Sequence, residues 1–449
     1  MGQDSILTIL GGISSLIWGL PLLILITMTG IFLTMRIGFL QIRLLPYSLK
    51  LAFSKSQDSD SEGDISHFQA LMTALAATIG TGNIVGVASA ILIGGPGALF
   101  WMWISAFFGM ATKYSEAVLA VKYRVQEEDG EMSGGPMYYL ERGLNQKWLG
   151  ILFALFGAIA AFGIGNLVQA NSVAGVVRSV FHIPNWGTGL ALTLFTGLVL
   201  LGGIQSIGRV TAFFIPFMAV FYVLAGLIII IMNATEIPAA LALIFRDAFT
   251  GEAAAGGALG TVIRYGVARG VFSNEAGLGS ASIAAAAAKT DLPARQALVS
   301  MTQVFIDTIV MCSITGLAIV LAGQYDSGLH GSELTTASFN SFLGPAGSYV
   351  VAISLLFFAS STIIGWSYYG EKCCSYLFSK KIIPYYRTLF VLAVFVGAVT
   401  SLEIVWTFAD IMNGLMALPN LIGILALSGV VAAETRVILK KIKDEKDIV

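Results

Sequence analysis

The chain has 449 residues, of which 56% are hydrophobic and 11% are charged, and its formal net charge is −1. A soluble protein carries about a quarter charged residues, so this composition and the mean hydropathy of +0.83 exclude that class. The near-zero charge argues against a nucleic-acid partner, and three cysteines, two of them adjacent, give no disulfide framework. We therefore expect a polytopic protein embedded in a lipid bilayer.

Apolar segments follow one another along the chain, each near the roughly 20 residues that a bilayer requires. Lipid-facing strands would need an alternation that is absent, so we expect a bundle of helices. The first segment lacks the basic start of a cleaved signal peptide and is long enough to remain as a span. Eleven spans are predicted, with cores at 14–35, 67–92, 97–121, 148–178, 186–204, 209–232, 256–287, 296–322, 346–371, 386–402 and 405–435, and amphipathic pieces at 39–53, 136–143 and 237–249.

Lys and Arg are distributed unevenly between the connections. Alternate connections and the C-terminal tail are rich in both, whereas residues 323–345 contain neither. Because basic residues are retained on the cytoplasmic side, the pattern predicts a plasma-membrane protein with its N-terminus outside and its C-terminus in the cytoplasm. Arg178, Arg246, Arg264 and Arg269 are exceptions, on or near the outer side.

Two spans are interrupted by polar and glycine-rich stretches. The second contains ATIGTGNIVG at 77–86, and the seventh contains GVFSNEAGLGS at 270–280. The seventh span comes five spans after the second, so the two segments cross in opposite directions, which is typical of inverted-topology repeats with broken helices. The predicted domains are an extra helix with its connection (1–66), a first five-helix repeat (67–233), a second, inverted repeat (234–435) and a basic tail (436–449).

The first interruption favours local unwinding, because each glycine costs about 1 kcal/mol in a helix interior relative to alanine. Unwinding frees amides and carbonyls, which need partners inside a membrane. A cation suits the carbonyls, and an anionic ligand group suits the amides near the positive end of the following half-helix. Close helix packing through Gly80, Gly82 and Gly86 would explain the glycines, but not their polar neighbours Thr78, Thr81 and Asn83.

At these residues the sequence resembles the sodium:alanine/glycine symporter family (alanine or glycine:cation symporters), within the amino acid–polyamine–cation superfamily. The most specific match is GGPGALFWMWISAFFG at 94–109, and both interruptions also fit the family pattern. The resemblance covers nearly the whole chain. It implies the leucine-transporter fold, with ten core helices in a five-plus-five inverted repeat, and sodium-driven uptake of alanine or glycine by alternating access. The residues alone indicate only an ion-coupled carrier of a small solute.

The resemblance also implies a substrate site. The amides of Thr81 and Gly82 would hold the carboxylate of a small neutral amino acid, and the backbone around Ser273 and Asn274 would accept from its ammonium. Phe272 would close over the substrate. The expected substrate-binding residues are Thr81, Gly82, Asn83, Gln169, Phe272, Ser273, Asn274 and Trp366. Trp366 would act as a wall that limits the pocket, although it could equally be a packed core aromatic.

Sodium would bind at two places by the same similarity. The carbonyl of Thr78 and the side chain of Asn83 would face one ion. The carbonyls of Ala76 and Ile79 would face the other, completed by Phe358, Ser361 and Thr362 on one face of the ninth span. Oxygen ligands suit a hard cation such as Na+. Hydroxyls bonded back to the preceding helical turn are the alternative.

Other intramembrane polar residues are also candidates. Glu275 is functional by default, or it forms an ion pair with Arg264 or Arg269. Asp307 and Thr308 serve either an ion site or hydrogen bonding between helices.

Other classes of function are less well supported. His67, His182 and His330 are scattered at span ends, and no HExxH or GxSxG motif occurs, so an enzyme is not expected. Broken helices at mid-depth favour alternating access over a channel. A proton-coupled carrier, or a carrier of another amino acid, is the closest alternative. No obligate protein partner is evident.

Overall fold

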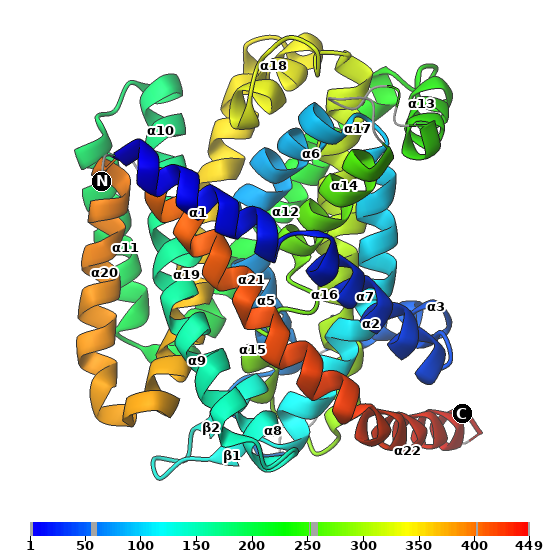
Figure 1. Ribbon diagram of the computed structural model, residues 1–449, viewed down its shortest axis with the longest axis vertical. Coiled ribbons are helices and arrows are strands. Elements are labelled where there is room, and N and C mark those ends of the chain that lie inside the picture. Colours follow the sequence, from blue (N-terminus) through cyan, green and yellow to red (C-terminus); the bar gives the residue numbers. More distant parts are fainter. Residues whose placement is uncertain (1–2, 55–60, 251, 253–258, 401–402, 448–449) are drawn as a thin grey trace.

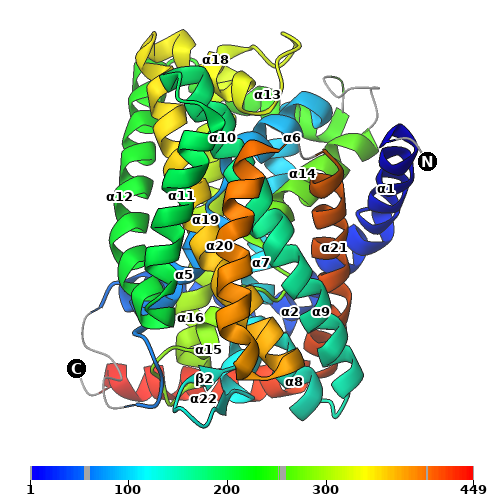
Figure 2. The same ribbon diagram turned by 90° about the vertical axis from the view of Figure 1, so that its left-hand side faces the viewer.

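The computed structural model describes residues 3–54, 61–250, 252, 259–400 and 403–447. Its long apolar helices stand side by side (Figures 1 and 2), because lipid offers no partner to an unpaired backbone group. The all-helical membrane bundle is therefore confirmed. Of the described helices, seven are long and apolar enough to cross a membrane, or eight with one bent pair, so the count of eleven is not established.

The N-terminal span is divided into two helices. α1 leans across the outside of the bundle (Figure 1), and α2 begins two residues beyond Trp18, with a proline in its first turn. Two short helices follow. These elements are α1 (Gln3–Ile17), α2 (Leu20–Arg36), α3 (Leu40–Arg43) and α4 (Leu45–Ala52).

The next elements correspond to the first predicted repeat. Ser66 starts α5 with a reciprocal capping box to Gln69. The elements are α5 (His67–Thr78), η1 (Gly82–Gly86), α6 (Val87–Gly94), α7 (Ala98–Lys122), β1 (Val125–Gln126), β2 (Met132–Ser133), α8 (Pro136–Arg142), α9 (Lys147–Phe162), η2 (Gly163–Leu167), α10 (Val168–Phe181), α11 (Asn185–Leu200) and α12 (Gly203–Met232).

The remaining elements correspond to the second predicted repeat and the tail. They are α13 (Ile237–Thr250), α14 (Leu259–Asn274), α15 (Ser282–Ala286), α16 (Pro293–Val304), η3 (Phe305–Cys312), α17 (Ser313–Ala322), α18 (Gly331–Leu343), α19 (Ala346–Phe378), η4 (Lys380–Ile382), α20 (Ile383–Val399), α21 (Glu403–Ala426) and α22 (Ser428–Asp447). No observation tests the proposed domain boundaries, which stay predictions.

Two predicted boundaries differ from the structure. The second interruption was expected over 270–280, but α14 stays helical through Asn274, and the irregular segment is 275–281. Gly277 and Gly279 have φ values of 93° and 84°, so the segment that follows the helix uses backbone conformations that favour glycine. The last span was expected to reach 435, but α21 ends at Ala426 and the charged α22 lies across the bundle end (Figure 2). Residues 256–258 of the seventh predicted span lie outside the described residues.

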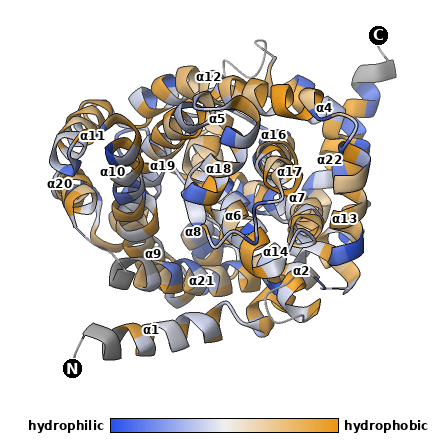
Figure 3. Cartoon of the chain, turned by 90° about the horizontal axis from the view of Figure 1, so that it is seen from above, coloured by the Kyte–Doolittle hydropathy of each residue, from blue (hydrophilic) through white to orange (hydrophobic). Residues whose placement is uncertain are grey.

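The bundle presents apolar side chains outward. Seen from above, the peripheral helices α11, α12 and α20 are largely hydrophobic (Figure 3). Leu198, Leu201 and Phe213 are each more than 70% exposed, which would be costly in water but suits contact with lipid. Several buried polar side chains lie at the two interrupted helices, namely Thr78, Thr81, Asn83, Ser273, Asn274 and Glu275.

The two ends of the bundle differ in their covering elements. α13 and α18 lie at one end, and α8, α22 and the β1–β2 hairpin lie at the other (Figures 1 and 2), which we call the hairpin end. There Lys372 Nζ donates to Glu131 and Ser133 at 3.1 and 3.0 Å. Arg124 donates to four backbone carbonyls at 2.7–3.0 Å, those of Glu62, Ala286, Ala288 and Thr290.

Candidate functional site

The first interruption is a true break in the helix. α5 ends at Thr78, Ile79 is extended (φ −73°, ψ 94°), and the helix that resumes at Gly82 is bent by 53° from α5. The released amide of Gly80 donates to the side-chain Oδ1 of Asn83 at 2.9 Å. The Thr81 amide donates to Oε1 of Gln169 at 3.4 Å, near the limit for a hydrogen bond. The broken helix predicted at this stretch is therefore present.

A small cavity of about 20 Å³ lies beside the break, and we call it the central cavity. Five of the predicted substrate residues line it, from four separate helices: Thr81, Gly82, Gln169, Phe272 and Trp366. Its other lining residues are Ala77, Thr78, Gly80, Ile164, Glu275, Thr362 and Asn413. The structure thus brings together residues nearly 300 positions apart in the sequence. Asn83, Ser273 and Asn274 are not among its lining residues.

The walls of the central cavity are held by specific hydrogen bonds. Gln169 Nε2 donates to Thr81 Oγ1 at 3.2 Å and to the carbonyl of Ile164 at 2.9 Å. The buried indole of Trp366 donates from Nε1 to Glu275 Oε1 at 3.0 Å. Both side chains are therefore fixed in orientation at the cavity, which core packing alone would not require.

Glu275 is the acidic residue of the central cavity. It is 4% exposed and adopts left-handed backbone (φ 56°), a costly conformation for a residue other than glycine. Its Oε2 accepts from the Ser280 hydroxyl. The alternative ion pair with Arg264 or Arg269 is absent among the described residues. Those arginines lie over the rings of Tyr265 and Phe272, at 5.9 and 5.5 Å.

A second polar cluster lies behind the break and joins the two interrupted helices. The fully buried Asp307 accepts from Asn83 Nδ2 at 2.8 Å, from Ser273 Oγ at 2.8 Å and from Thr308 Oγ1 at 2.8 Å. Asn274 Nδ2 also donates to Thr308 Oγ1 at 3.0 Å. The three predicted residues absent from the central cavity are all in this cluster. A carboxylate with the hydroxyl oxygens of Ser273 and Thr308 beside it offers oxygen ligands of the kind that a hard cation prefers.

The residues predicted for the other sodium ion also approach one another. Thr362 Oγ1 donates to the carbonyls of Ile79 and Phe358 at 3.3 and 3.0 Å. Ser361 Oγ donates to the Phe358 carbonyl at 2.8 Å, so both hydroxyls show the back-bonding expected as the alternative. Ala76 and Thr78 occupy the last turn of α5 beside them. The expected oxygen atoms therefore lie close together, in an arrangement that fits both a sodium site and hydroxyls bonded back to the preceding helical turn.

Sequence reasoning missed Asn413 and Asp410 of α21. Asn413 is 1% exposed and lines the central cavity, and its Oδ1 has no hydrogen-bond partner in the described part of the chain. Buried polar atoms are normally paired, so this oxygen is available to accept a hydrogen bond from a group in the cavity. Both residues are polar positions in an apolar span, which is a signal the sequence does contain.

Comparison with known proteins agrees with this arrangement. The model of the sodium:alanine symporter family matches residues 3–449. The chain belongs to this family. It is 61% identical over 432 residues to the sodium/alanine symporter AgcS of Methanococcus maripaludis, covering 94% of this chain and 95% of that protein. It is 40% identical over 441 residues to the probable sodium/glutamine symporter GlnT of Bacillus subtilis, covering 98% and 92%.

The fold is similar to that of a solved transporter. The crystal structure of MhsT in complex with L-phenylalanine matches with a TM-score of 0.56 at 13% identity, over 84% of this chain and 99% of that one. At that identity the likeness shows the fold alone. As a member of the sodium:alanine symporter family, the protein is a multi-pass membrane transporter that performs sodium-coupled amino acid symport.

Proposed function

We propose that the protein carries alanine, together with sodium, through the central cavity. The observation that carries the proposal is the broken helix α5–η1, whose amides reach a small cavity walled by Trp366 and Phe272. The sodium/alanine symporter AgcS, 61% identical, makes alanine the first substrate to test. Glycine, which is smaller still, is the second.

The carboxylate of the substrate would bind the amides of Thr81 and Gly82. Gln169 holds the Thr81 amide only at 3.4 Å, so a charged carboxylate, which forms shorter and stronger hydrogen bonds, competes well for it. The helix that begins at Gly82 adds the positive end of its dipole. Gln169 would then remain as a side-chain contact through its hydrogen bond to Thr81 Oγ1.

The ammonium of the substrate would lie on the opposite side of the cavity. Glu275 keeps acceptor capacity beyond its bonds to Trp366 and Ser280, because a carboxylate can accept about four hydrogen bonds. The unpaired Oδ1 of Asn413 adds a second acceptor. The Ser273 carbonyl stays a candidate, whereas the carbonyl of Asn274 already accepts from Gln303 at 3.0 Å.

Sodium would bind in the cluster around Asp307, with Asn83 and Thr78 on one side and Ser273 and Thr308 on the other. A second ion would bind the carbonyls of Ala76, Ile79 and Phe358 with the hydroxyls of Ser361 and Thr362. Buried charge supports cation binding, since an uncompensated carboxylate in a membrane is costly. Around the two breaks, the described residues include three buried carboxylates and one buried ammonium, which are Glu116, Glu275, Asp307 and Lys113.

The protein would be oriented in the plasma membrane with its N-terminus outside and its C-terminus in the cytoplasm. α1 and α22 lie toward opposite ends of the bundle (Figure 2), which agrees with an odd number of crossings. The hairpin end would then face the cytoplasm, where basic residues are retained.

Uptake of labelled alanine into proteoliposomes tests this function. An inward sodium gradient should drive accumulation, and an equal potassium gradient should not. Competition by glycine, but not by glutamine, would establish the small-substrate specificity. Uptake that follows a proton gradient and ignores sodium would contradict the proposal and support proton coupling instead.

A further inference from the structure

An apolar groove of about 400 Å³ lies between α11 and α20. The two helices lie side by side at the periphery of the bundle (Figure 3). Leu194, Leu198 and Leu392 line the groove, and each of these side chains is more than half exposed. Because lipid surrounds the outside of a membrane bundle, this groove is open to the acyl chains of the bilayer.

The groove carries a charge at one position. Among its lining residues in the described part of the chain, Arg387 alone is charged. Its guanidinium group donates to Glu371 of α19, from Nε to Oε2 at 2.6 Å and from Nη2 to Oε1 at 2.9 Å. A guanidinium group has five N–H donors, so this pairing leaves three of them, two on Nη1 and one on Nη2. Arg387 can therefore bind an anion without releasing Glu371.

Arg387 lies at the hairpin end of the groove. It belongs to the second turn of α20, which follows η4, where Lys380 binds Asp129 of the β1–β2 hairpin. A Cβ at Gly203, where α12 begins, would lie 3.3 Å from Arg387 Nη2. The guanidinium group is thus close to the turn that joins α11 to α12, near the surface of the membrane.

The apolar part of the groove extends from Arg387 toward the middle of the bundle. A Cβ at Gly197 of α11 would lie 3.6 Å from Val391 of α20, so the two helices run antiparallel, with earlier residues of α11 beside later residues of α20. The missing side chain at Gly197 helps to keep the groove open. The groove thus joins a cation near the membrane surface to an apolar lining at greater depth, which matches the chemistry of an anionic phospholipid.

Other residues near this end are typical of a membrane surface. Tyr385 is 68% exposed, and tyrosine is enriched where acyl chains meet headgroups. Lys381, which precedes α20, and Arg209, within two turns of the start of α12, are also exposed. Exposed basic residues near the membrane surface attract anionic headgroups, so the surroundings of Arg387 favour a negatively charged lipid.

We propose that the groove between α11 and α20 binds one anionic phospholipid of the surrounding bilayer. Arg387 holds the phosphate through Nη1 and Nη2, and one acyl chain packs along the exposed leucines of the groove. Guanidinium groups bind phosphate through two parallel N–H···O bonds, and the edge formed by Nη1 and Nη2 offers such a pair. Because the same guanidinium group holds Glu371, the lipid joins α19 to α11 and α20. This ligand is distinct from the transported solute.

Native mass spectrometry of the purified full-length protein tests the proposal. Phosphatidylglycerol is the anionic probe, and phosphatidylcholine with the same acyl chains is the neutral one. The wild-type monomer should retain one phosphatidylglycerol about tenfold more tightly than phosphatidylcholine, because charge-assisted bonds are the stronger ones. Gly197→Leu places a side chain in the groove and should weaken phosphatidylglycerol binding about tenfold. This variant is expected to fold, since leucine is a better helix former than glycine.

A second variant removes the charge and keeps the groove. Arg387→Gln combined with Glu371→Gln leaves no buried carboxylate unpaired, and it should abolish the preference for phosphatidylglycerol. Arg142→Gln is the matched control, because Arg142 is an exposed arginine of α8 at the same end of the bundle. The control should keep the wild-type preference.

Thermal unfolding in detergent supplies the second readout. Added phosphatidylglycerol should raise the unfolding temperature of the wild type, because a ligand that binds the folded state stabilises it, and it should not raise that of Gly197→Leu. Equal rises in both proteins would overturn the proposal, as would unchanged phosphatidylglycerol affinity in Gly197→Leu and in the double variant.

Three further results would assign the groove or its charge differently and overturn the proposal. An equal loss of affinity in Arg142→Gln would indicate diffuse attraction by any basic residue at this end. Displacement of phosphatidylglycerol by inorganic phosphate at the same concentration would make Arg387 a site for a free anion. A wild-type dimer that Gly197→Leu converts to monomers would make the groove an interface with a second copy of the chain.

Discussion

The two interrupted helices satisfy their released backbone groups in opposite ways. At the break after α5, the Thr81 amide has only a long hydrogen bond to Gln169 and lies beside the central cavity. At the break after α14, the amides of Gly277 and Gly279 both donate to Glu116 Oε1, at 2.9 and 3.1 Å. The first break is therefore open to a ligand, whereas the second is closed by a carboxylate of the chain itself.

A buried ion pair completes the closed break. Lys113 Nζ donates to the carbonyl of Glu275 at 3.0 Å and lies 3.6 Å from Glu116 Oε2. Asn420 Nδ2 donates both to Glu116 Oε1 and to the Gly277 carbonyl, at 2.8 Å each. The carboxylate of Glu116 thus binds the free amides and the ammonium of Lys113 binds the free carbonyl, in place of an anionic and a cationic ligand. In the proposed function, the amides of the first break bind the cargo, whereas the amides of Gly277 and Gly279 at the second break are occupied by Glu116.

Removing the internal carboxylate should have the largest effect. Glu116→Leu leaves Lys113 buried without its counter-charge and two amides without an acceptor, so we expect a loss of about 3–5 kcal/mol in the free energy of unfolding. Thermal unfolding in nanodiscs measures this. Glu434→Gln, which breaks a partly exposed pair with Lys122, is the control and should cost less than about 1 kcal/mol. Equal losses in the two variants would mean that the second break does not depend on Glu116.

A bulky side chain at the open break should abolish alanine binding while the protein still folds. A Cβ at Gly82 would lie 3.2 Å from the Cα of Ser273, so Gly82→Val crowds α14 at the amides proposed for the carboxylate. We expect sodium-dependent alanine binding to the central cavity to disappear while the unfolding temperature falls only modestly. Gly175→Val is a matched control in open space. Normal alanine affinity in Gly82→Val would place the site elsewhere.

The wall of the open break should set which amino acids fit. Trp366→Ala removes a large side chain from the central cavity, and a packed pocket admits no extra methylenes until such space is created. Uptake of leucine and glutamine should rise relative to alanine, as competition assays would show. If the order of competitors stays the same, Trp366 is a core aromatic and not a specificity residue.

Loss of one hydroxyl should weaken sodium binding without removing a substrate contact. For Thr362→Ala we expect about a tenfold rightward shift in the sodium dependence of uptake, as for a ligand worth about 1.4 kcal/mol. Alanine affinity should recover at saturating sodium, because the two ligands are thermodynamically linked. Ser360→Ala, two residues away, removes a hydroxyl that donates to the Leu356 carbonyl at 2.6 Å, and it should leave the sodium curve in place. Equal curves for Thr362→Ala and wild type would exclude Thr362 as an ion ligand.

The smallest effect is expected where ion pairs are exposed. The ammonium of Lys380 lowers the pKa of Asp129 in the hairpin below its usual value. Because the folded pKa is the lower one, the pair stabilises the protein above the usual pKa, and that contribution is lost as the pH falls through the lowered value. Asp129→Asn should cost less than about 1 kcal/mol at neutral pH. Its unfolding temperature should match that of the wild type in strongly acidic buffer, and a difference that persists there would assign another role to Asp129.

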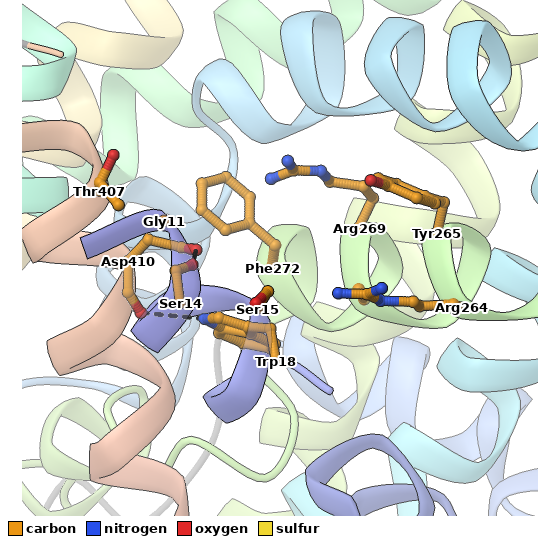
Figure 4. A pocket seen from close by; sticks show the side chains of 11 residues that line it. Gly11, Ser14, Ser15, Trp18, Arg264, Tyr265, Arg269, Phe272, Thr407 and Asp410 are labelled. Atoms are coloured by element: carbon orange, nitrogen blue, oxygen red, sulfur yellow. Dashed lines mark hydrogen bonds between the residues drawn. The ribbon is translucent and has the colours of Figure 1, made fainter. Parts of the chain in front are cut away.

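Local signals in the sequence account for the first break and its surroundings. The glycines and threonines next to Asn83 predicted the unwinding of the helix. Gln169 and Trp366 could be named as candidates because they are a polar and an aromatic residue on predicted spans. The closed break was placed several residues too early, because the turn depends on Glu116 and Lys113 of another helix. Asp410 and Asn413 were missed for a related reason. Asp410 is held by hydrogen bonds from α1 (Figure 4), and Asn413 lines a cavity formed by distant segments. Pairings between distant segments cannot be read from a periodic apolar pattern.

Arg124 has a mechanical consequence at the hairpin end. One guanidinium group joins the chain before α5 to the last residue of α15 and the chain that follows it, through four carbonyls. All four hydrogen bonds depend on the position of one planar guanidinium group. If α15 moves away, their loss is coupled, whereas four separate side chains could lose their bonds independently. The four hydrogen bonds are therefore expected to form and break together. This coupling favours two discrete arrangements of this end over a continuum of partly opened ones.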